Sequence, residues 1–275
     1  MMECIRVTDS TKSWFLPLLP AEFQSPQENL GVYLIGAVMD GVACGAMAVQ
    51  LRDDLADIRW FYVAEEYRER GVASGMLDCL CRLMWEDAIP VTCTFAAADQ
   101  EDPLYLFFAE KENFSVEPQE GYVCRIPLAE LAEDSSITEL GGRGATPQEF
   151  FALSALERKR FYQKLQELDV HYLEDVSEEE LFPSLCLYTK EGGNLKTAAF
   201  IVREGEELEL VCLYSVPGAQ RDLMNVLAEL CRRLPKTGNL WISAVNPSSA
   251  ALTDRLLPQR VITARYYRAA WDMEL

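Results

Sequence analysis

Apolar residues recur along this chain with two spacings, and the two spacings alternate. Short apolar and aromatic runs bounded by turn formers are typical of strands, whereas apolar residues three and four positions apart are typical of helices. In the first half, this pattern predicts strands at 4–7, 32–38, 43–51, 56–63, 90–96 and 121–126. It predicts helices at 14–19, 72–84 and 104–113. The order is that of a mixed α/β domain.

Residues that favour turns and helix ends support these bounds. Asp40-Gly41 lies between two apolar runs, which predicts a tight hairpin turn. Asp102-Pro103 combines a capping side chain with a proline at the first helical position, and Asn113 suits a left-handed helix end. The polar stretch 21–29 is predicted to be a loop, a type of segment that frequently carries binding residues.

The second half of the chain repeats this order. Residues 131–147 are rich in turn-forming residues and are predicted to be a linker. Because the repeat is half the chain long, we expect a duplicated domain, with domains at 1–130 and 148–275. An unrelated α/β domain in the second half is the alternative. The predicted elements are a helix at 148–168, strands at 181–188, 197–203 and 208–215, a helix at 221–234, a strand at 240–245, a helix after Asn246-Pro247 and a strand at 260–272.

The composition fits two such domains and narrows the partners. With 275 residues, 49% of them hydrophobic, each half can bury a core. The net charge of −19 argues against nucleic acid as a partner, because that binding depends on Lys and Arg neutralising phosphates. An acidic surface attracts a cationic substrate such as an amine, although it also simply increases solubility. The sequence shows neither a membrane span nor the order of a signal peptide, so we expect a cytoplasmic protein that binds no membrane.

The cysteine and histidine content argues against metal chemistry. Nine cysteines are scattered through apolar segments without the spacing of zinc ligands, so we expect reduced thiols that pack as small hydrophobic residues. The single histidine, His171, argues against a histidine-based triad or a multi-histidine metal site. We therefore expect no metal.

A glycine-bearing turn joins the predicted strand 56–63 to the helix 72–84. It contains Arg68, Arg70 and Gly71, and Gly75 follows in the first helical turn. The amide N–H groups at a helix start, together with the helix dipole, attract phosphate, and glycine lets an anion approach the backbone. The glycine and lysine patterns of a Rossmann fingerprint and of a nucleotide P-loop are both missing here. A turn without a ligand is the alternative.

The spacing Arg68-x-x-Gly71-x-Ala73 resembles the acetyl-CoA loop of the GNAT superfamily of N-acetyltransferases, Gln/Arg-x-x-Gly-x-Gly/Ala. The segment 107–114, Phe-Phe-Ala-Glu-Lys-Glu-Asn-Phe, resembles the second signature of that family. The resemblance implies an α/β (α+β) fold of two tandem GNAT-like domains, each a mixed, mostly antiparallel sheet flanked by helices. The corresponding turn of the second half, Val216 to Asp222, lacks the spacing, so we expect that domain not to bind the cofactor.

The family's chemistry implies acetyl-CoA as co-substrate and direct attack of a small primary amine on the thioester. The strands on either side of the cofactor splay apart to admit the pantetheine arm, and backbone groups at the end of the fourth strand bind the thioester carbonyl. An acceptor would be selected by the loop at 21–30 and by the groove between the two domains, and the protein would be a monomer or a homodimer. The residues implied in cofactor binding are Phe61, Tyr62, Val63, Arg68, Glu69, Arg70, Gly71, Val72, Ala73 and Ser74.

The sequence departs from the family at the residue that protonates the leaving thiolate. Ala109 stands where the family often has a tyrosine. Tyr105 lies four residues earlier, hence on the same helix face, and either it or Tyr62 could supply the hydroxyl; both could equally be core residues. Glu101 and Asp102 could act as bases, although Asp102 fits better as a helix cap. A non-catalytic CoA-binding module, or an interaction scaffold without a ligand, is the alternative function.

Overall fold

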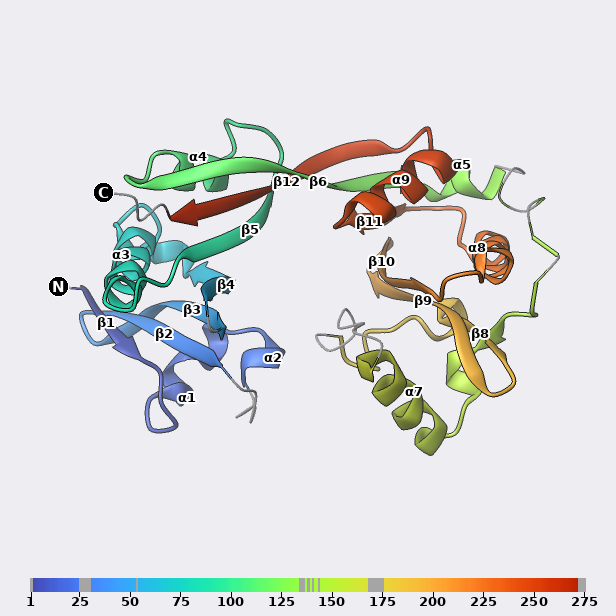
Figure 1. Cartoon of the computed structure of the whole chain (residues 1–275), viewed down its shortest axis with the longest axis horizontal. Coiled ribbons are helices and arrows are strands. Elements are labelled where there is room, and N and C mark those ends of the chain that lie inside the picture. The colour runs from blue at the N-terminus through green and yellow to red at the C-terminus, as the bar shows by residue number, and fades with distance from the viewer. Residues whose placement is uncertain are drawn as a thin grey trace. The chain divides into compact units, whose positions relative to one another are not determined.

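The computed structural model describes residues 2–24, 31–52, 54–133, 137, 139, 141, 142, 144–167 and 176–271. The chain divides into two compact units. Unit 1 comprises Met1–Gln119 and Arg265–Leu275, and unit 2 comprises Glu120–Ala264 (Figure 1). No helix in the described ranges has the length and apolar character needed to cross a membrane.

The sheet of unit 1 is mostly antiparallel, as predicted. Its neighbouring strands pair antiparallel from β1 to β4 and between β5 and β12, whereas β4 and β5 pair in parallel. The hairpin between β2 and β3 turns at Asp40 and Gly41, which both have positive φ, as the sequence predicted. The strand order is β1 (Met2–Arg6), β2 (Val32–Met39), β3 (Val42–Arg52), β4 (Leu55–Val63), β5 (Val91–Ala97), β12 (Val261–Trp271) and β6 (Phe114–Pro127).

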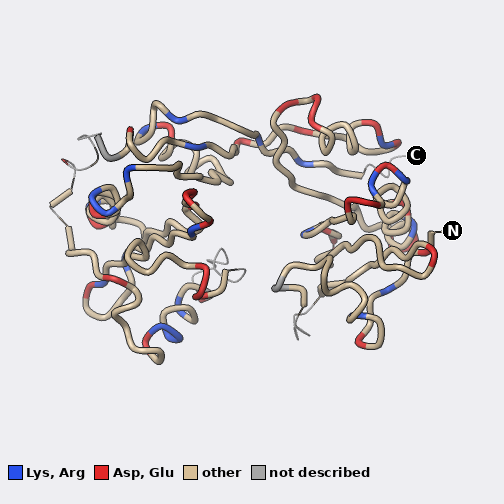
Figure 2. The backbone as a smooth tube through the Cα atoms, turned by 180° about the vertical axis from the view of Figure 1, so that it is seen from behind, with Lys and Arg blue, Asp and Glu red and all other residues tan. Residues whose placement is uncertain are grey.

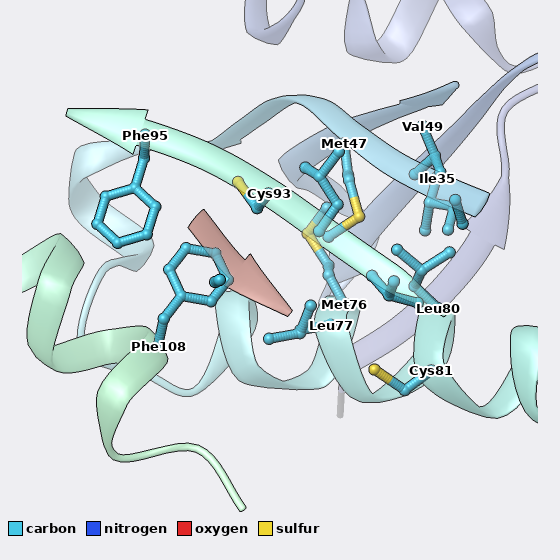
Figure 3. Packing of buried hydrophobic residues seen from close by; sticks show 14 of the residues in the cluster. Ile35, Met47, Val49, Met76, Leu77, Leu80, Cys81, Cys93, Phe95 and Phe108 are labelled. Atoms are coloured by element: carbon cyan, nitrogen blue, oxygen red, sulfur yellow. The ribbon is translucent and has the colours of Figure 1, made fainter. Parts of the chain in front are cut away.

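Helices cover both faces of this sheet. One face carries α3 (Val72–Trp85) and α4 (Pro103–Ala109), whose apolar side chains form a core with Met47, Val49 and the strands beside them (Figure 3). The other face carries Phe15 and Leu19, which pack with Ala46, the residue next to Met47. Since successive strand residues point to opposite faces, the two cores lie on opposite sides of the sheet. The short helices on this second side are α1 (Lys12–Phe15), η1 (Leu16–Leu18) and α2 (Ala21–Gln24), with η2 (Glu65–Tyr67) in the turn after β4.

Unit 2 has the same plan. Its strands pair antiparallel except β10 and β11, which pair in parallel. Ala199 and Ile201 face the core under α5, α8 and α9, whereas Ala198 and Phe200 face the core under α7. The elements are α5 (Leu128–Glu133), β7 (Gln148–Glu149), η3 (Phe150–Ala152), α7 (Ala155–Glu167), η4 (Pro183–Leu185), β8 (Leu187–Glu191), β9 (Asn194–Glu204), β10 (Glu207–Ser215), α8 (Gln220–Arg233), β11 (Asn239–Ala244) and α9 (Pro247–Leu256).

The two units exchange a strand. Residues Arg265–Ala270 of β12 pair with β5 in unit 1, although they follow unit 2 in the sequence. Residues Tyr122–Pro127 of β6 pair with β11 in unit 2. The units therefore differ from the domains expected at 1–130 and 148–275. A strand pattern in the sequence identifies a strand but not its partner, because pairing between distant segments leaves no local signal.

Several described residues of the predicted linker at 131–147 pack within unit 2. Leu131 and Ile137 are buried in the core beneath α8. The amide N–H of Gly142 donates to Asn225 Oδ1 at 2.5 Å, and that of Ala145 donates to Asp222 Oδ1 at 2.6 Å. The turn-forming residues of this stretch thus belong to a segment that is hydrogen-bonded to α8.

Several predicted bounds are wrong, because short helical turns or strand residues occupy the ends of the predicted elements. Residues 21–24 of the predicted loop are helical, and residues 25–30 and His171 lie outside the described residues. The helix α4 ends at Ala109, and Asn113, which is left-handed with φ 65°, lies beyond its end because β6 begins at Phe114. The predicted helix 148–168 begins only at 155, and the predicted strand 181–188 contains η4 and forms its ladder from 187 onward.

Candidate functional site

The strands β4 and β5 of unit 1 form a fork. Their parallel ladder consists of three pairs and ends at Ile58 and Cys93. Beyond these residues β4 continues to Val63 and β5 to Ala97, and no further pairing joins them in the described structure. On the other edge of β4 the register shifts, because Ile58 pairs with Val49 whereas Trp60 pairs with Ala48. This bulge at Arg59 increases the local twist, which separates β4 from β5.

One arm of the fork presents backbone amides. The amide of Ala64 donates to Cys44 O at 3.0 Å, so Ala64 and Tyr62 direct their backbone groups toward β3. Because these directions alternate along a strand, Phe61 and Val63 direct theirs toward the fork, where the ladder has ended. The carbonyl of Val63 accepts a hydrogen bond from Arg68 Nε at 3.1 Å. The amide N–H groups of Phe61 and Val63 therefore face the space between the strands.

The helix α3 begins beside this fork with an uncapped N-terminus. Gly71 is its N-cap, in the left-handed region with φ 78°, and no side chain caps the helix. The first intrahelical hydrogen bond runs from Gly75 N to Gly71 O, so the amides of residues 72–74 have no backbone acceptor among the described residues. A Cβ atom added to Gly71 would meet no atom within 4 Å. The absence of acidic residues from the first turn completes an open site for an anion.

The two arginines of the turn are exposed. The Arg68 guanidinium lies 5.7 Å from the Tyr62 ring centroid and 3.8 Å from a Glu65 carboxylate oxygen. Such an exposed ion pair is weak. The Arg70 guanidinium lies 5.5 Å from the Tyr67 ring centroid. Both arginines therefore stay available next to the helix N-terminus, with Glu69 between them at φ 60°.

The two candidate tyrosines lie on opposite faces of the sheet. Tyr62 stacks on Trp60 at 6.2 Å, on the face covered by α1. Tyr105 lies in α4 on the face covered by α3, and its ring meets that of Tyr267 edge-on at 4.9 Å. Phe107 of α4 packs edge-on against Phe61 at 5.8 Å, which fixes α4 beside the fork. Tyr105, and not Tyr62, thus lies on the α4 side of the fork.

Sequence reasoning missed Tyr267 as a neighbour of this site. It reaches Tyr105 because the exchanged strand β12 lies next to β5. Its ring also stacks on Phe95 at 5.9 Å. The aromatic run at 266–271 was visible in the sequence, but nothing local to it indicated the unit to which it belongs.

The two acidic candidates, Asp102 and Glu101, differ in their contacts. Asp102 is a helix cap, since its carboxylate accepts from the amides of Leu104 at 2.9 Å and Ala98 at 3.2 Å. This confirms its predicted structural role. Glu101 is exposed beside it. Asp102 therefore acts as a structural residue at the start of α4.

The thiol nearest the fork is not a nucleophile. Cys93 ends the ladder of β5 and is buried. Burial raises its pKa to about 12, and the charge of Asp57 adds to the shift. A thiol with this pKa is protonated at neutral pH and unreactive. Among the described residues, no group of three or more His, Cys, Asp or Glu side chains could hold a metal ion.

Unit 2 contains a second fork, but its helix N-terminus is covered. The parallel ladder of β10 and β11 again has three pairs, ends at Leu210 and Ile242, and is followed by a bulge in β10. The first turn of α8 contains Asp222, whose carboxylate accepts from Ala145. A Cβ atom on Gly144 would lie 2.8 Å from the Arg221 carbonyl, so the docked segment lies directly on the helix start. Sequence reasoning missed this covering segment.

Comparison with known proteins identifies the fold. Residues 2–110 match the model of the acetyltransferase (GNAT) family. No curated protein matches the sequence. The structure is similar to a tandem GNAT protein from the clavulanic acid biosynthesis pathway, with 13% identity, a TM-score of 0.60 and coverage of 98% of each chain.

Two further solved structures are also similar to this one. One is a GCN5-related N-acetyltransferase from Anabaena variabilis, with 14% identity, a TM-score of 0.59 and coverage of 98% of this chain and 72% of that chain. The other is a conserved protein from Enterococcus faecalis described as a probable N-acyltransferase, with 13% identity, a TM-score of 0.58 and the same coverage. Residues 2–110 therefore carry a GNAT domain, and the whole chain has a tandem GNAT fold.

Proposed function

We propose that the GNAT domain at residues 2–110 binds acetyl-CoA and transfers its acetyl group to a small primary amine by direct attack on the thioester. One observation carries this proposal: in unit 1, a fork between two strands opens beside an uncapped helix N-terminus with free space over Gly71. A diphosphate needs amide N–H groups and positive potential, and a thin acyl-bearing arm needs a gap in a sheet.

Each part of the site would have a separate task. The amides of Val72 to Ser74 would hold the diphosphate, with the side chains of Arg68 and Arg70 beside them. The amides of Phe61 or Val63 would donate to the thioester carbonyl as charge develops on its oxygen. A donor of this kind contributes about 3–4 kcal/mol to transition-state stabilisation in acyl transfer. Acetyl-CoA would supply the activated acyl group, and the protein would supply proximity and these donors.

General acid catalysis would make only a small contribution to the rate of this reaction. We assign protonation of the departing thiolate to Tyr105, because it lies on the α4 side of the fork and one helical turn before Ala109. Thiols ionise near pH 8.5, so the thiolate is a good leaving group and a general acid is helpful without being essential. Acidic residues occur along the chain in both units (Figure 2), and an acidic protein favours a cationic acceptor that loses a proton before attack.

A non-catalytic module that binds coenzyme A is the second function that an observation favours. The usual hydroxyl is missing at Ala109, and the ring of Tyr105 is engaged by Tyr267. Both functions use the same cofactor site, but only the enzyme would consume acetyl-CoA. Release of free thiol from acetyl-CoA in the presence of a panel of primary amines supports the enzyme, whereas tight binding without any release supports the module.

The cofactor site itself is tested with a matched pair of variants. Gly71 and Gly218 both have positive φ and open space, and they precede the corresponding helices of units 1 and 2. Gly71→Asp places a carboxylate where the diphosphate would bind and is expected to weaken acetyl-CoA binding about tenfold or more in calorimetry. Gly218→Asp should leave it unchanged. Equal affinities for both variants would refute the proposed site.

A further inference from the structure

The fork of unit 2 leads into a large apolar cavity. Its volume is about 530 Å³, within the range of small-molecule pockets. The walls come from β10, β11, α8 and α9. Most of its 25 lining residues are Leu, Ile or Val; none is aromatic, Lys, Arg or His, and Glu209 is the one carboxylate residue. The remaining lining comprises two cysteines and seven polar residues including Glu209, so the wall is mainly aliphatic.

At two corresponding places unit 1 has aromatic rings that unit 2 lacks, and one of these places lines the cavity. In unit 1, Phe95 of β5 and Phe108 of α4 stack at 5.1 Å and fill the space between the helices and the sheet (Figure 3). Phe95 lies two residues after the last pair of its ladder, and in β11 the same place is held by Ala244. Phe108 lies five residues after the first proline of its helix, and in α9 the same place is held by Leu252.

Three polar lining residues of α9 and its N-cap already make hydrogen bonds. Asn246 Oδ1 accepts from Ser249 N at 2.9 Å, and Ser249 Oγ donates to Asn246 O at 2.8 Å. Thr253 Oγ1 donates to Ser249 O at 2.8 Å. These groups therefore offer little to a polar ligand. An anionic ligand would also find no cation in the lining, and burying an unpaired charge is costly.

We propose that this cavity binds an uncharged aliphatic chain. Nonpolar cavities stay dry and accept apolar molecules, because such ligands replace no hydrogen-bonded water. The absence of aromatic and cationic side chains from the lining selects a flexible hydrocarbon over a planar or phosphorylated molecule. The site is separate from the acetyl-CoA site, and the inference stands whether or not unit 1 transfers an acetyl group.

Primary alcohols from hexanol to dodecanol, titrated into the full chain by calorimetry, test this inference. Affinity should rise by up to about fourfold for each added methylene until the chain fills the cavity. Decanoate, which has a charged head on a similar chain, should bind about tenfold more weakly than decanol. Equal affinity for the two ligands, or no binding of any alcohol, would overturn the proposal.

Methyl NMR locates the binding. Decanol should shift the methyl signals of Leu227 and Leu252, which line the cavity, and leave those of Leu77 and Leu80 in the core of unit 1 unchanged. Equal shifts in both units would mean non-specific partitioning and would overturn the proposal. Coenzyme A, added as a competitor, should not reverse the shifts.

Variants that fill the cavity complete the test. Leu252→Phe restores a ring at the place that Phe108 holds in unit 1, and it should weaken decanol binding about tenfold without lowering the melting temperature. Leu227→Phe fills the cavity from α8 and serves as the second variant if the first one unfolds. Leu104→Phe, on the exposed side of α4, is the matched control and should bind decanol normally. Unaltered binding in both filled variants would contradict the proposal.

Discussion

In unit 1 the fork leaves backbone amides exposed, whereas in unit 2 the corresponding fork leaves apolar surface exposed. Both forks arise from a parallel ladder of three pairs followed by a bulge. In unit 1 the N-terminus of α3 is open and the space beneath α4 is filled by aromatic rings. In unit 2 the N-terminus of α8 is covered and the space beneath α9 is empty.

This comparison separates two properties that a single GNAT-like fold could combine. The backbone plan makes a gap, and the residues around the gap decide which chemistry it accepts. A glycine and an uncapped helix suit an anion. A carboxylate at the helix start with a docked segment excludes an anion, and small side chains in place of rings admit hydrocarbon.

The largest expected effect tests the packing beneath α4 and α9. Phe108 is fully buried and stacked on Phe95, so Phe108→Ala should lower the free energy of unfolding of unit 1 by about 3–5 kcal/mol. Leu252 faces an existing cavity and is half-buried, so Leu252→Ala should cost unit 2 only about 1–2 kcal/mol.

Urea unfolding of the full chain, followed by methyl signals of each unit, measures both costs separately. Leu104→Ala, at an exposed position of α4, is the control and should have little effect. Should Leu252→Ala cost as much as Phe108→Ala, unit 2 would be as tightly packed as unit 1 and the contrast between the forks would disappear.

The second prediction concerns the covered helix start of unit 2. Asp222 accepts a hydrogen bond from the Ala145 amide, and a hydrogen bond to a charged group is worth about 1.5–3 kcal/mol. Asp222→Ala should therefore lower the stability of unit 2 by about 2 kcal/mol and speed amide hydrogen exchange at Gly142 and Ala145. The matched change in α3, Ser74→Ala, should leave unit 1 nearly unaffected. Unchanged exchange at residue 145 would show that the segment is held by other contacts.

The open helix start of unit 1 could be predicted from sequence because its determinants are local. Gly71, its spacing to Arg68 and the strand before them lie within a few residues of one another, and the structure gives Gly71 the left-handed conformation that its position requires. The cap at Asp102 was equally local. The Gly71 turn and the Asp102 cap both depend on interactions between residues close together in the sequence, so a sequence pattern can predict them.

The features that sequence reasoning missed all depend on contacts between residues that are far apart in the sequence. Nothing near Tyr267 indicates that β12 joins the sheet of unit 1, and nothing near Ala145 indicates that its amide meets Asp222. The cavity of unit 2 is lined by Leu252, which looks like an ordinary core residue until it is compared with Phe108 of unit 1. The difference in side-chain volume between the two units is recognised only when their folded structures are compared.

The smallest expected effect asks whether the two cores are equally dry. Cys93 in unit 1 and Cys212 in unit 2 are both buried, and burial raises the pKa of each thiol from 9.0 to about 12, with Asp57 and Cys186 adding to the respective shifts. The folded state keeps these protons above pH 9, whereas the unfolded state loses them. Each thiol's contribution is therefore complete below pH 9 and is lost as the pH rises toward 12.

Each thiol should lower stability by about 1.4 kcal/mol per pH unit above pH 9. Unfolding of Cys93→Ala and Cys212→Ala at pH 8, 9.5 and 10.5, compared with the parent chain, isolates the two slopes. The Cys93 thiol packs in the core under α3 and α4, whereas the Cys212 thiol packs in the core under α7, on the face of the sheet opposite the cavity. Equal slopes would mean that these two cores exclude water equally well, so that the looser packing of unit 2 is confined to the space beneath α9. A clearly smaller slope for Cys212 would mean that water also enters unit 2 on its α7 side, and the contrast between the two forks would then be one part of a generally looser unit 2.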